Sequence, residues 1–133
     1  MKMDKKIVRL AVFFGLTSVI LGAFGAHALK AVLTDQQLVS FETGVRYQMF
    51  HALFLLFVAS SKLISDKIKK TISVILTLGV LFFSGSIYLL ATQDLLGVSM
   101  KFLGPITPIG GLLLMISWLL LGVNIGKQKT DNK

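Results

Sequence analysis

The chain has 133 residues, enough for one domain, of which 54% are hydrophobic and only 15% are charged, so a water-soluble fold is excluded. Disulfides and thiolate metal sites are excluded as well, because the sequence contains no cysteine. The net charge of +8 comes from short clusters between long apolar runs, and this pattern predicts a lipid bilayer with an anionic inner leaflet, and no nucleic acid, as the partner.

Long apolar segments predict four transmembrane helices in a single membrane domain, residues 1–133. The predicted spans are about 7–29, 41–64, 71–93 and 108–126. A helix needs about 20 apolar residues to cross a hydrocarbon core of roughly 30 Å. The second span has a short uncharged stretch, so we expect Arg46 and Lys62 to reach towards the headgroups. The predicted fold is all-α, an antiparallel four-helix transmembrane bundle.

The distribution of lysine and arginine predicts the orientation of these spans. Eleven of the 14 Lys and Arg residues fall in the N-terminal segment, the loop after the second span and the C-terminal tail. Because basic loops stay in the cytoplasm, the bundle is predicted to be N-in/C-in. Ala26-His27-Ala28 imitates a signal-peptide cleavage site, but the apolar run before it exceeds the usual length of about 7–15 residues.

The connection before the second span contains a helix-start signal. Thr34 and Gln37 have the spacing of a capping box, so a helix is predicted to begin at Asp35. We interpret the following residues as an amphipathic helix that leads into the second span. Glu42 and Arg46, four residues apart, are predicted to form an interfacial ion pair. In the alternative interpretation, Arg46 binds an anionic headgroup.

The fourth span is predicted to begin with Thr107 as its cap. Pro108 then takes the first helical position, where a missing N–H leaves no hydrogen bond unmade. Residues 102–106 would form a turn or a short re-entrant piece packed against protein.

Glycines within the spans predict close helix packing, because lipid provides no hydrophobic driving force between helices. The predicted packing positions are Gly22, Gly25, Gly44, Gly111, Gly122 and Gly126. Gly122 and Gly126 form a G-x-x-x-G pair, for which we favour packing inside the bundle over a dimer motif.

Polar side chains of the spans are predicted to gather inside the outer half of the bundle. On a helical wheel Tyr47, Gln48 and His51 share one sector, and polar groups are costly in lipid, so this sector should face inward. The predicted polar cluster, packed or open as a cavity, consists of His27, Tyr47, Gln48, His51, Ser84, Ser86, Tyr88 and Thr107.

The residues of this cluster admit several chemistries. The two histidines could ligate a metal or haem or carry protons, and Ser84 or Ser86 could be a nucleophile with His51 as its base. However, hydroxyls in transmembrane helices usually serve packing, and no G-x-S-x-G motif occurs. We therefore predict no metal, no cofactor and no catalytic residue.

Four motifs in order along the chain resemble a known family. They are GAFGAHAL at 22–29, FETGVRYQMFHAL at 41–53, FSGSIY at 83–88 and LGPITPIGG at 103–111. They resemble the YwdK/YgdD-type family of small bacterial membrane proteins, which is similar also to eukaryotic transmembrane protein 256. The resemblance covers about residues 7 to 125 and implies a multi-pass plasma-membrane protein, but no biochemical activity.

Three functions stay open from the sequence. We favour a non-enzymatic membrane component that binds lipid, a homo-oligomeric copy or another membrane protein. A small transporter would use Gln48 and His51 along a water-filled path, but the inner halves of the spans lack amide, histidine or charged lining and no internal repeat supports it. An intramembrane enzyme is the second alternative.

Overall fold

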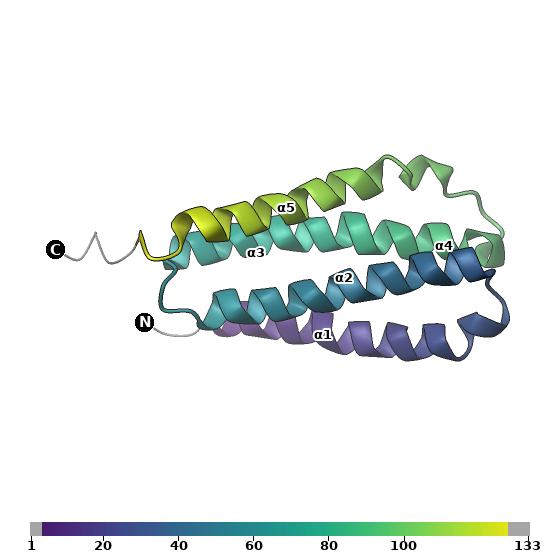
Figure 1. The fold of residues 1–133 in the computed structure, drawn as a ribbon, viewed down its shortest axis with the longest axis horizontal. Coiled ribbons are helices and arrows are strands. Elements are labelled where there is room, and N and C mark those ends of the chain that lie inside the picture. The colour runs from purple at the N-terminus through teal and green to yellow at the C-terminus, as the bar shows by residue number, and fades with distance from the viewer. Residues whose placement is uncertain (1–3, 128–133) are drawn as a thin grey trace.

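The computed structural model describes residues 4–127, which form helices joined by short turns (Figure 1). No strand occurs in this part of the chain, so the predicted all-α class is confirmed. The helices are α1 Lys5–Ala26, α2 Asp35–Ser60, α3 Asp66–Val80, α4 Ser86–Leu96 and α5 Ile106–Asn124. A π-helical turn, Leu81–Gly85, joins α3 to α4, and 3-10 turns lie at Leu29–Ala31 and Lys101–Leu103.

Three helical stretches are long and apolar enough to cross a membrane. They are Lys5–Ala31, Asp66–Leu96 and Lys101–Asn124. Helix α2 is also long, with 26 residues, but its composition is more polar than that of the other three. The crossing of α2 therefore stays a prediction.

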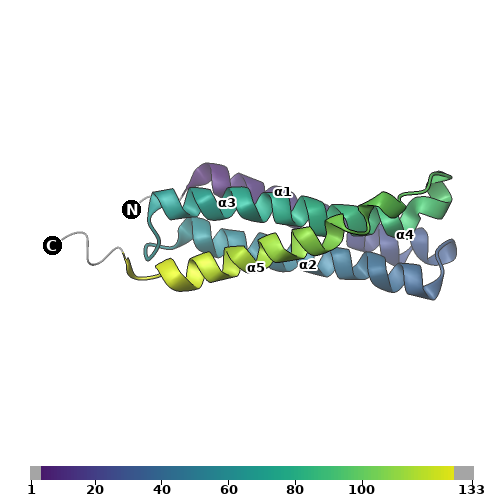
Figure 2. The same cartoon turned by 90° about the horizontal axis from the view of Figure 1, so that it is seen from above.

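The helices form two layers that lie along each other (Figures 1 and 2). One layer is α1 with α2, and the other is α5 with the continuous α3–α4 rod. Helix α2 also contacts α3 and α4 across the layers, so it is the most enclosed helix. Hydrogen bonds from Asp4 N to Ala59 O (3.2 Å) and from Gly126 N to Leu63 O (2.9 Å) bring the start of α1 and the end of α5 to the same end of the molecule.

Side-chain caps determine where the first three helices begin. The predicted capping box is confirmed: Gln37 N donates to Thr34 Oγ1 (3.1 Å), and Thr34 N donates to Gln37 Oε1 (3.0 Å). Asp4 caps α1 through its carboxylate, and Ser65 caps α3 through its hydroxyl. Each cap satisfies backbone N–H groups that have no partner within the helix.

The predicted start of α5 is wrong by two residues. The helix begins at Ile106, directly after Pro105, and no side chain caps it. Thr107 lies inside the first turn, and its hydroxyl contacts Ser86 instead. Pro108 still lies within the first turn, where the helix requires no N–H donor.

Close helix approach occurs at some of the predicted glycines and not at others. A Cβ added to Gly44 would lie 2.7 Å from the Tyr88 ring, and one on Gly25 would lie 3.1 Å from the Phe41 ring. For Gly22 and Gly111 the nearest atoms would be 3.4 and 3.6 Å away.

The prediction that Gly122 and Gly126 pack inside the bundle is wrong. Among residues 4–127, no atom of a packing neighbour lies within 4 Å of an added Cβ at either position. Gly126 follows the end of α5 with a φ of +81°, a conformation that glycine adopts without strain, so its role is to end the helix.

Large apolar side chains lie on the surface of the bundle as well as in its core, and several polar side chains are buried. Large apolar side chains cover the outside of every long helix, as at Leu119, Val19 and Phe50. The buried polar residues are Ser18, Gln48, His51, Lys69, Ser73, Ser84, Ser86 and Ser117. A continuous apolar exterior around a partly polar interior is the arrangement expected in lipid.

Candidate functional site

Gln48 of α2 joins three helices through one buried amide. Its Nε2 donates to Phe14 O (3.0 Å) and to Thr17 Oγ1 (2.6 Å), both on α1. Its Oε1 accepts a hydrogen bond from the Tyr88 hydroxyl of α4 (2.7 Å). Because both N–H groups are used, this amide has no donor left for a ligand.

The serines of the predicted cluster also bond to protein. Ser84, within the π-helical turn, donates to Gly44 O of α2 (2.7 Å). Ser86 and Thr107 share a hydrogen bond of 2.6 Å between their hydroxyls, which joins the α4 and α5 helices. The Ser84 bond joins the two layers, whereas the Ser86–Thr107 bond joins two helices of one layer, and together they leave little polar capacity in the interior.

His51 is held in one neutral tautomer by two hydrogen bonds. The indole Nε1 of Trp118 on α5 lies 3.1 Å from His51 Nε2, and His51 Nδ1 lies 2.6 Å from Tyr47 O. An indole N–H can only donate, so His51 Nε2 must accept. The proton is therefore on Nδ1, which donates to the Tyr47 carbonyl.

The His51–Trp118 pair lies in a lateral crevice between α2 and α5, with a volume of about 540 Å³. The crevice is lined by Tyr47, Phe50, His51, Leu53, Phe54 and Trp118. The Phe54 and Trp118 rings are in contact, with centroids 4.3 Å apart. Tyr47, Phe50, Leu53 and Trp118 remain 42–56% exposed, so the crevice opens sideways from the bundle. We call this feature the aromatic crevice.

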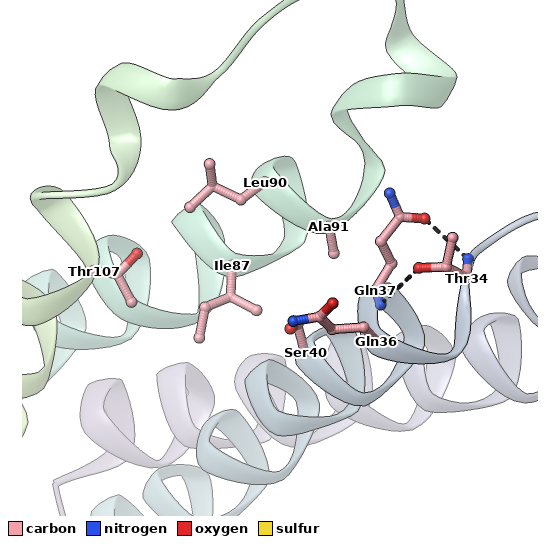
Figure 3. Close-up of a pocket in the computed structure, with 8 residues that line it drawn as sticks. All are labelled: Thr34, Gln36, Gln37, Ser40, Ile87, Leu90, Ala91 and Thr107. Atoms are coloured by element: carbon pink, nitrogen blue, oxygen red, sulfur yellow. Dashed lines mark hydrogen bonds between the residues drawn. The ribbon is translucent and has the colours of Figure 1, made fainter.

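A second hollow, of about 380 Å³, lies between the start of α2 and α4 (Figure 3). It is lined by Thr34, Gln36, Gln37, Ser40, Ile87, Leu90, Ala91 and Thr107. Gln37 is already engaged in the capping box and also donates from Nε2 to Asp94 Oδ2 (2.9 Å). Of the predicted cluster, only Thr107 borders this hollow.

Of the two remaining predicted residues, Tyr47 contacts the cluster and His27 does not share a hydrogen bond with it in the described part of the chain. His27 is exposed at the end of α1, so its place in the cluster stays a prediction. Tyr47 contributes its carbonyl to His51, while its ring packs on Phe83 with centroids 4.9 Å apart.

The predicted ion pair between Glu42 and Arg46 is not formed within the described residues. Arg46 Nη2 instead donates to Thr43 Oγ1 (3.3 Å). Both charged side chains are exposed, where a single ion pair provides little stabilisation to hold two long side chains together.

Lys69 has a role that sequence reasoning missed. The predicted spans place Lys69 in the loop after the second span, but in the structure it lies on α3 and is only 1% exposed. Its Nζ donates to Ala59 O (3.0 Å), one of the last carbonyls of α2. A buried cation at a helix C-terminus interacts favourably with the unpaired carbonyls there.

The geometry offers little for metal binding or acyl transfer. Within residues 4–127 no three His, Asp or Glu side chains lie together as a metal site would require. The hydroxyls of Ser84 and Ser86 bond to protein oxygens and not to His51, so these residues form no nucleophile–base pair.

The chain is similar to a family described as "Protein of unknown function (DUF423)", which matches residues 21–111. A UPF0382 membrane protein of Haemophilus influenzae is 38% identical over 128 residues, which cover 96% of this chain and 99% of that protein. UPF0382 membrane protein YwdK of Bacillus subtilis is 38% identical over 124 residues, 90% and 94% of the two chains. UPF0382 inner membrane protein YgdD of Escherichia coli is 37% identical over 121 residues, 90% and 88% of the two chains. No solved structure matches.

Proposed function

We propose that this chain, which belongs to the DUF423 family, is a lipid-binding, non-enzymatic protein of the cell membrane. The resemblance to the YwdK/YgdD-type family is confirmed by the relatives, whose names describe membrane proteins. The proposed topology is an antiparallel bundle of four spans with both termini in the cytoplasm. Its binding site for a lipid chain is the aromatic crevice.

The positions of the basic residues support this topology. The start of α1, the loop between α2 and α3 and the end of α5 lie at one end of the bundle. These segments and the terminal residues beside them carry eleven of the 14 Lys and Arg residues, and basic segments stay in the cytoplasm. Helix α2 would cross together with its neighbours, because it packs against α1, α3 and α4 and turns Gln48 and His51 inward.

The single observation that supports lipid binding is the chemistry of the aromatic crevice. Both ring nitrogens of His51 and the indole N–H of Trp118 are already paired. A ligand in the crevice therefore meets mainly ring and aliphatic carbon, which suits a hydrocarbon chain. The volume of about 540 Å³ lies within the usual range of ligand sites, and the opening faces the surrounding membrane.

The interior hydrogen bonds favour binding over transport and over catalysis. A permeation path needs polar groups that water or a solute can reach, whereas Gln48, Ser84 and Ser86 bond to neighbouring helices. An acyl-transfer enzyme would need a hydroxyl beside His51, which is paired with Trp118 instead.

Trp118 provides the test, because it is the only tryptophan in the chain. We expect a phosphatidylcholine brominated in its acyl chains to quench Trp118 fluorescence of the detergent-solubilised protein. The quenching should saturate at about one lipid per protein, because the crevice has room for one site. The measurement is a titration of tryptophan emission against brominated lipid.

The control moves the reporter to a surface without a crevice. In the double variant Trp118→Phe, Phe13→Trp the new tryptophan replaces a side chain on α1 that is 57% exposed, close to the 52% of Trp118. We expect its quenching to rise steadily without saturation, as for surrounding lipid. Identical curves for the two proteins would exclude a lipid site in the crevice.

A further inference from the structure

Two hollows flank Lys70 at the end of the bundle where α1 and α3 begin. The larger, of about 500 Å³, lies between these helices and is lined by Asp4, Lys5, Lys6, Ile7, Leu10, Lys70, Ser73 and Val74. The smaller, of about 330 Å³, is lined by Lys67, Lys70, Thr71, Val74 and Ile75. Lys70 and Val74 border both, so they form a ridge between the two hollows. We call the two together the basic groove.

The cations of the basic groove have no partner among residues 4–127. The ammonium groups of Lys5, Lys6 and Lys70 make no hydrogen bond or ion pair with this part of the chain. The one carboxylate in the larger hollow, Asp4, accepts hydrogen bonds from the backbone N–H groups of Lys6 and Ile7. In the larger hollow the positive charges of Lys5, Lys6 and Lys70 outnumber the one carboxylate, and Lys67 adds a fourth positive charge in the smaller hollow, so the groove attracts anions.

The lining of the groove changes from charged at the starts of α1 and α3 to apolar one helical turn further along each helix. Lys5 and Lys6 lie in the first turn of α1, and Leu10 follows one turn deeper. On α3, Val74 lies one turn deeper than Lys70. A charged mouth above apolar walls matches a ligand with an anionic head and hydrocarbon tails, and basic pockets between helices on the cytoplasmic side bind such lipids.

We propose that the basic groove binds one anionic glycerophospholipid of the cytoplasmic leaflet. Its phosphate contacts Lys5, Lys6 and Lys70, and its two acyl chains lie in the two hollows on either side of Val74. The site rests on the orientation proposed above, with the start of α1 in the cytoplasm. It is separate from the aromatic crevice, which lies between α2 and α5.

The test compares two double variants that remove the same charge from the same end of the protein. Lys6→Gln with Lys70→Gln removes two cations of the groove, whereas Arg9→Gln with Lys62→Gln removes two exposed cations outside it. Native mass spectrometry of the purified full chain in detergent measures binding of phosphatidylglycerol and of phosphatidylcholine with identical acyl chains.

We expect the unmodified protein to prefer phosphatidylglycerol and the groove variant to lose most of that preference, by about fivefold for each lysine. The control variant should keep it. An equal loss in both variants would overturn the proposal, because the preference would then reflect net charge alone. Displacement of the lipid by an equal concentration of free glycerol 3-phosphate would also overturn it, since equal affinity would mean that the acyl chains add nothing.

The proposals for the two lipid sites can be tested independently. Quenching of Trp118 by brominated phosphatidylcholine reports only on the aromatic crevice and should be the same in the groove variant and in the unmodified protein. A groove variant that loses both phosphatidylglycerol preference and saturable quenching would show one shared site, which contradicts the proposal.

Discussion

The hydrogen bond between the Tyr88 hydroxyl and Gln48 Oε1 joins α4 to α2 in a buried part of the bundle. Gln48 is 5% exposed, so its Oε1 loses a buried hydrogen bond if the Tyr88 hydroxyl is removed. The other tyrosine, Tyr47, differs, because its ring packs on Phe83 while its hydroxyl makes no hydrogen bond within the described residues. The two tyrosines therefore separate the effect of the hydrogen bond from that of losing a hydroxyl.

Tyr88→Phe is expected to lower the free energy of unfolding by about 1–2 kcal/mol, because it leaves the Gln48 carbonyl without its partner. Tyr47→Phe should change stability by less than about 0.5 kcal/mol. Unfolding of both variants in mixed micelles, followed by circular dichroism, provides the comparison. Equal stability of the two would mean that the buried hydrogen bond contributes nothing.

The sequence predicted the inward direction of Gln48 and His51 but not their partners. The helical wheel depends on the period of one helix alone, and it places both side chains on the enclosed face of α2. The partners, Phe14 O and Trp118 Nε1, lie 34 and 67 residues away in the chain, so only the packing of three helices brings them together. His27 is the residue after α1 and is exposed, so the period of one helix does not assign it to an enclosed face.

At the scale of elements, the contact between α5 and the π-helical turn determines how closely the two helices of that layer approach. A Cβ on Gly110 would collide with the backbone N of Phe83 and lie 2.6 Å from the Phe82 carbonyl carbon. The extra residue of a π turn widens the backbone at this point, and only a glycine on the facing helix leaves room for it.

Local signals predicted the helix starts but not this contact. The capping box at Thr34 and Gln37 lies within four residues, so the sequence alone shows it. No residue type marks a π turn, and Gly110 is adjacent to Gly111, so sequence could not say which of the two meets the other helix. The packing role was assigned to Gly111, which makes only an ordinary contact of 3.6 Å with the Phe83 ring.

Gly110→Ala should destabilise the protein by about 1–3 kcal/mol, since neither backbone can move away from the added methyl group without disturbing the layer. Gly111→Ala is the matched control and should remain within about 1 kcal/mol of the unmodified protein. The midpoint of thermal unfolding in detergent measures both. Equal unfolding midpoints for the two variants would mean that the close approach at Gly110 does not limit the packing of the two helices.

At the scale of the whole molecule, the apolar exterior and the unequal numbers of Lys and Arg at the two ends predict how the bundle lies in the membrane. The end with the basic groove carries eleven of the 14 Lys and Arg residues, whereas the other end carries only Lys30, Arg46 and Lys101. We therefore expect the basic end to lie in the cytoplasm and the bundle to insert in that one orientation.

Cysteine labelling tests this orientation directly, because the chain has no native cysteine. Gln36→Cys lies at the proposed outer end, beside the hollow of Figure 3, and Lys67→Cys lies at the inner end. In intact cells an impermeant maleimide should label the first variant, and it should label the second only after the membrane is permeabilised. The reverse pattern would overturn the orientation and move the basic groove to the outer leaflet.

A third variant, His51→Cys, tests whether the interior is packed, as its hydrogen bonds indicate. His51 is 4% exposed and its two ring nitrogens are paired with Tyr47 O and Trp118 Nε1, so no aqueous route from the outer end is expected to reach residue 51. In a correctly inserted protein this cysteine should stay unlabelled from outside while Gln36→Cys reacts. Labelling at both positions would reveal a water-filled path beneath the outer hollow and would favour transport over lipid binding.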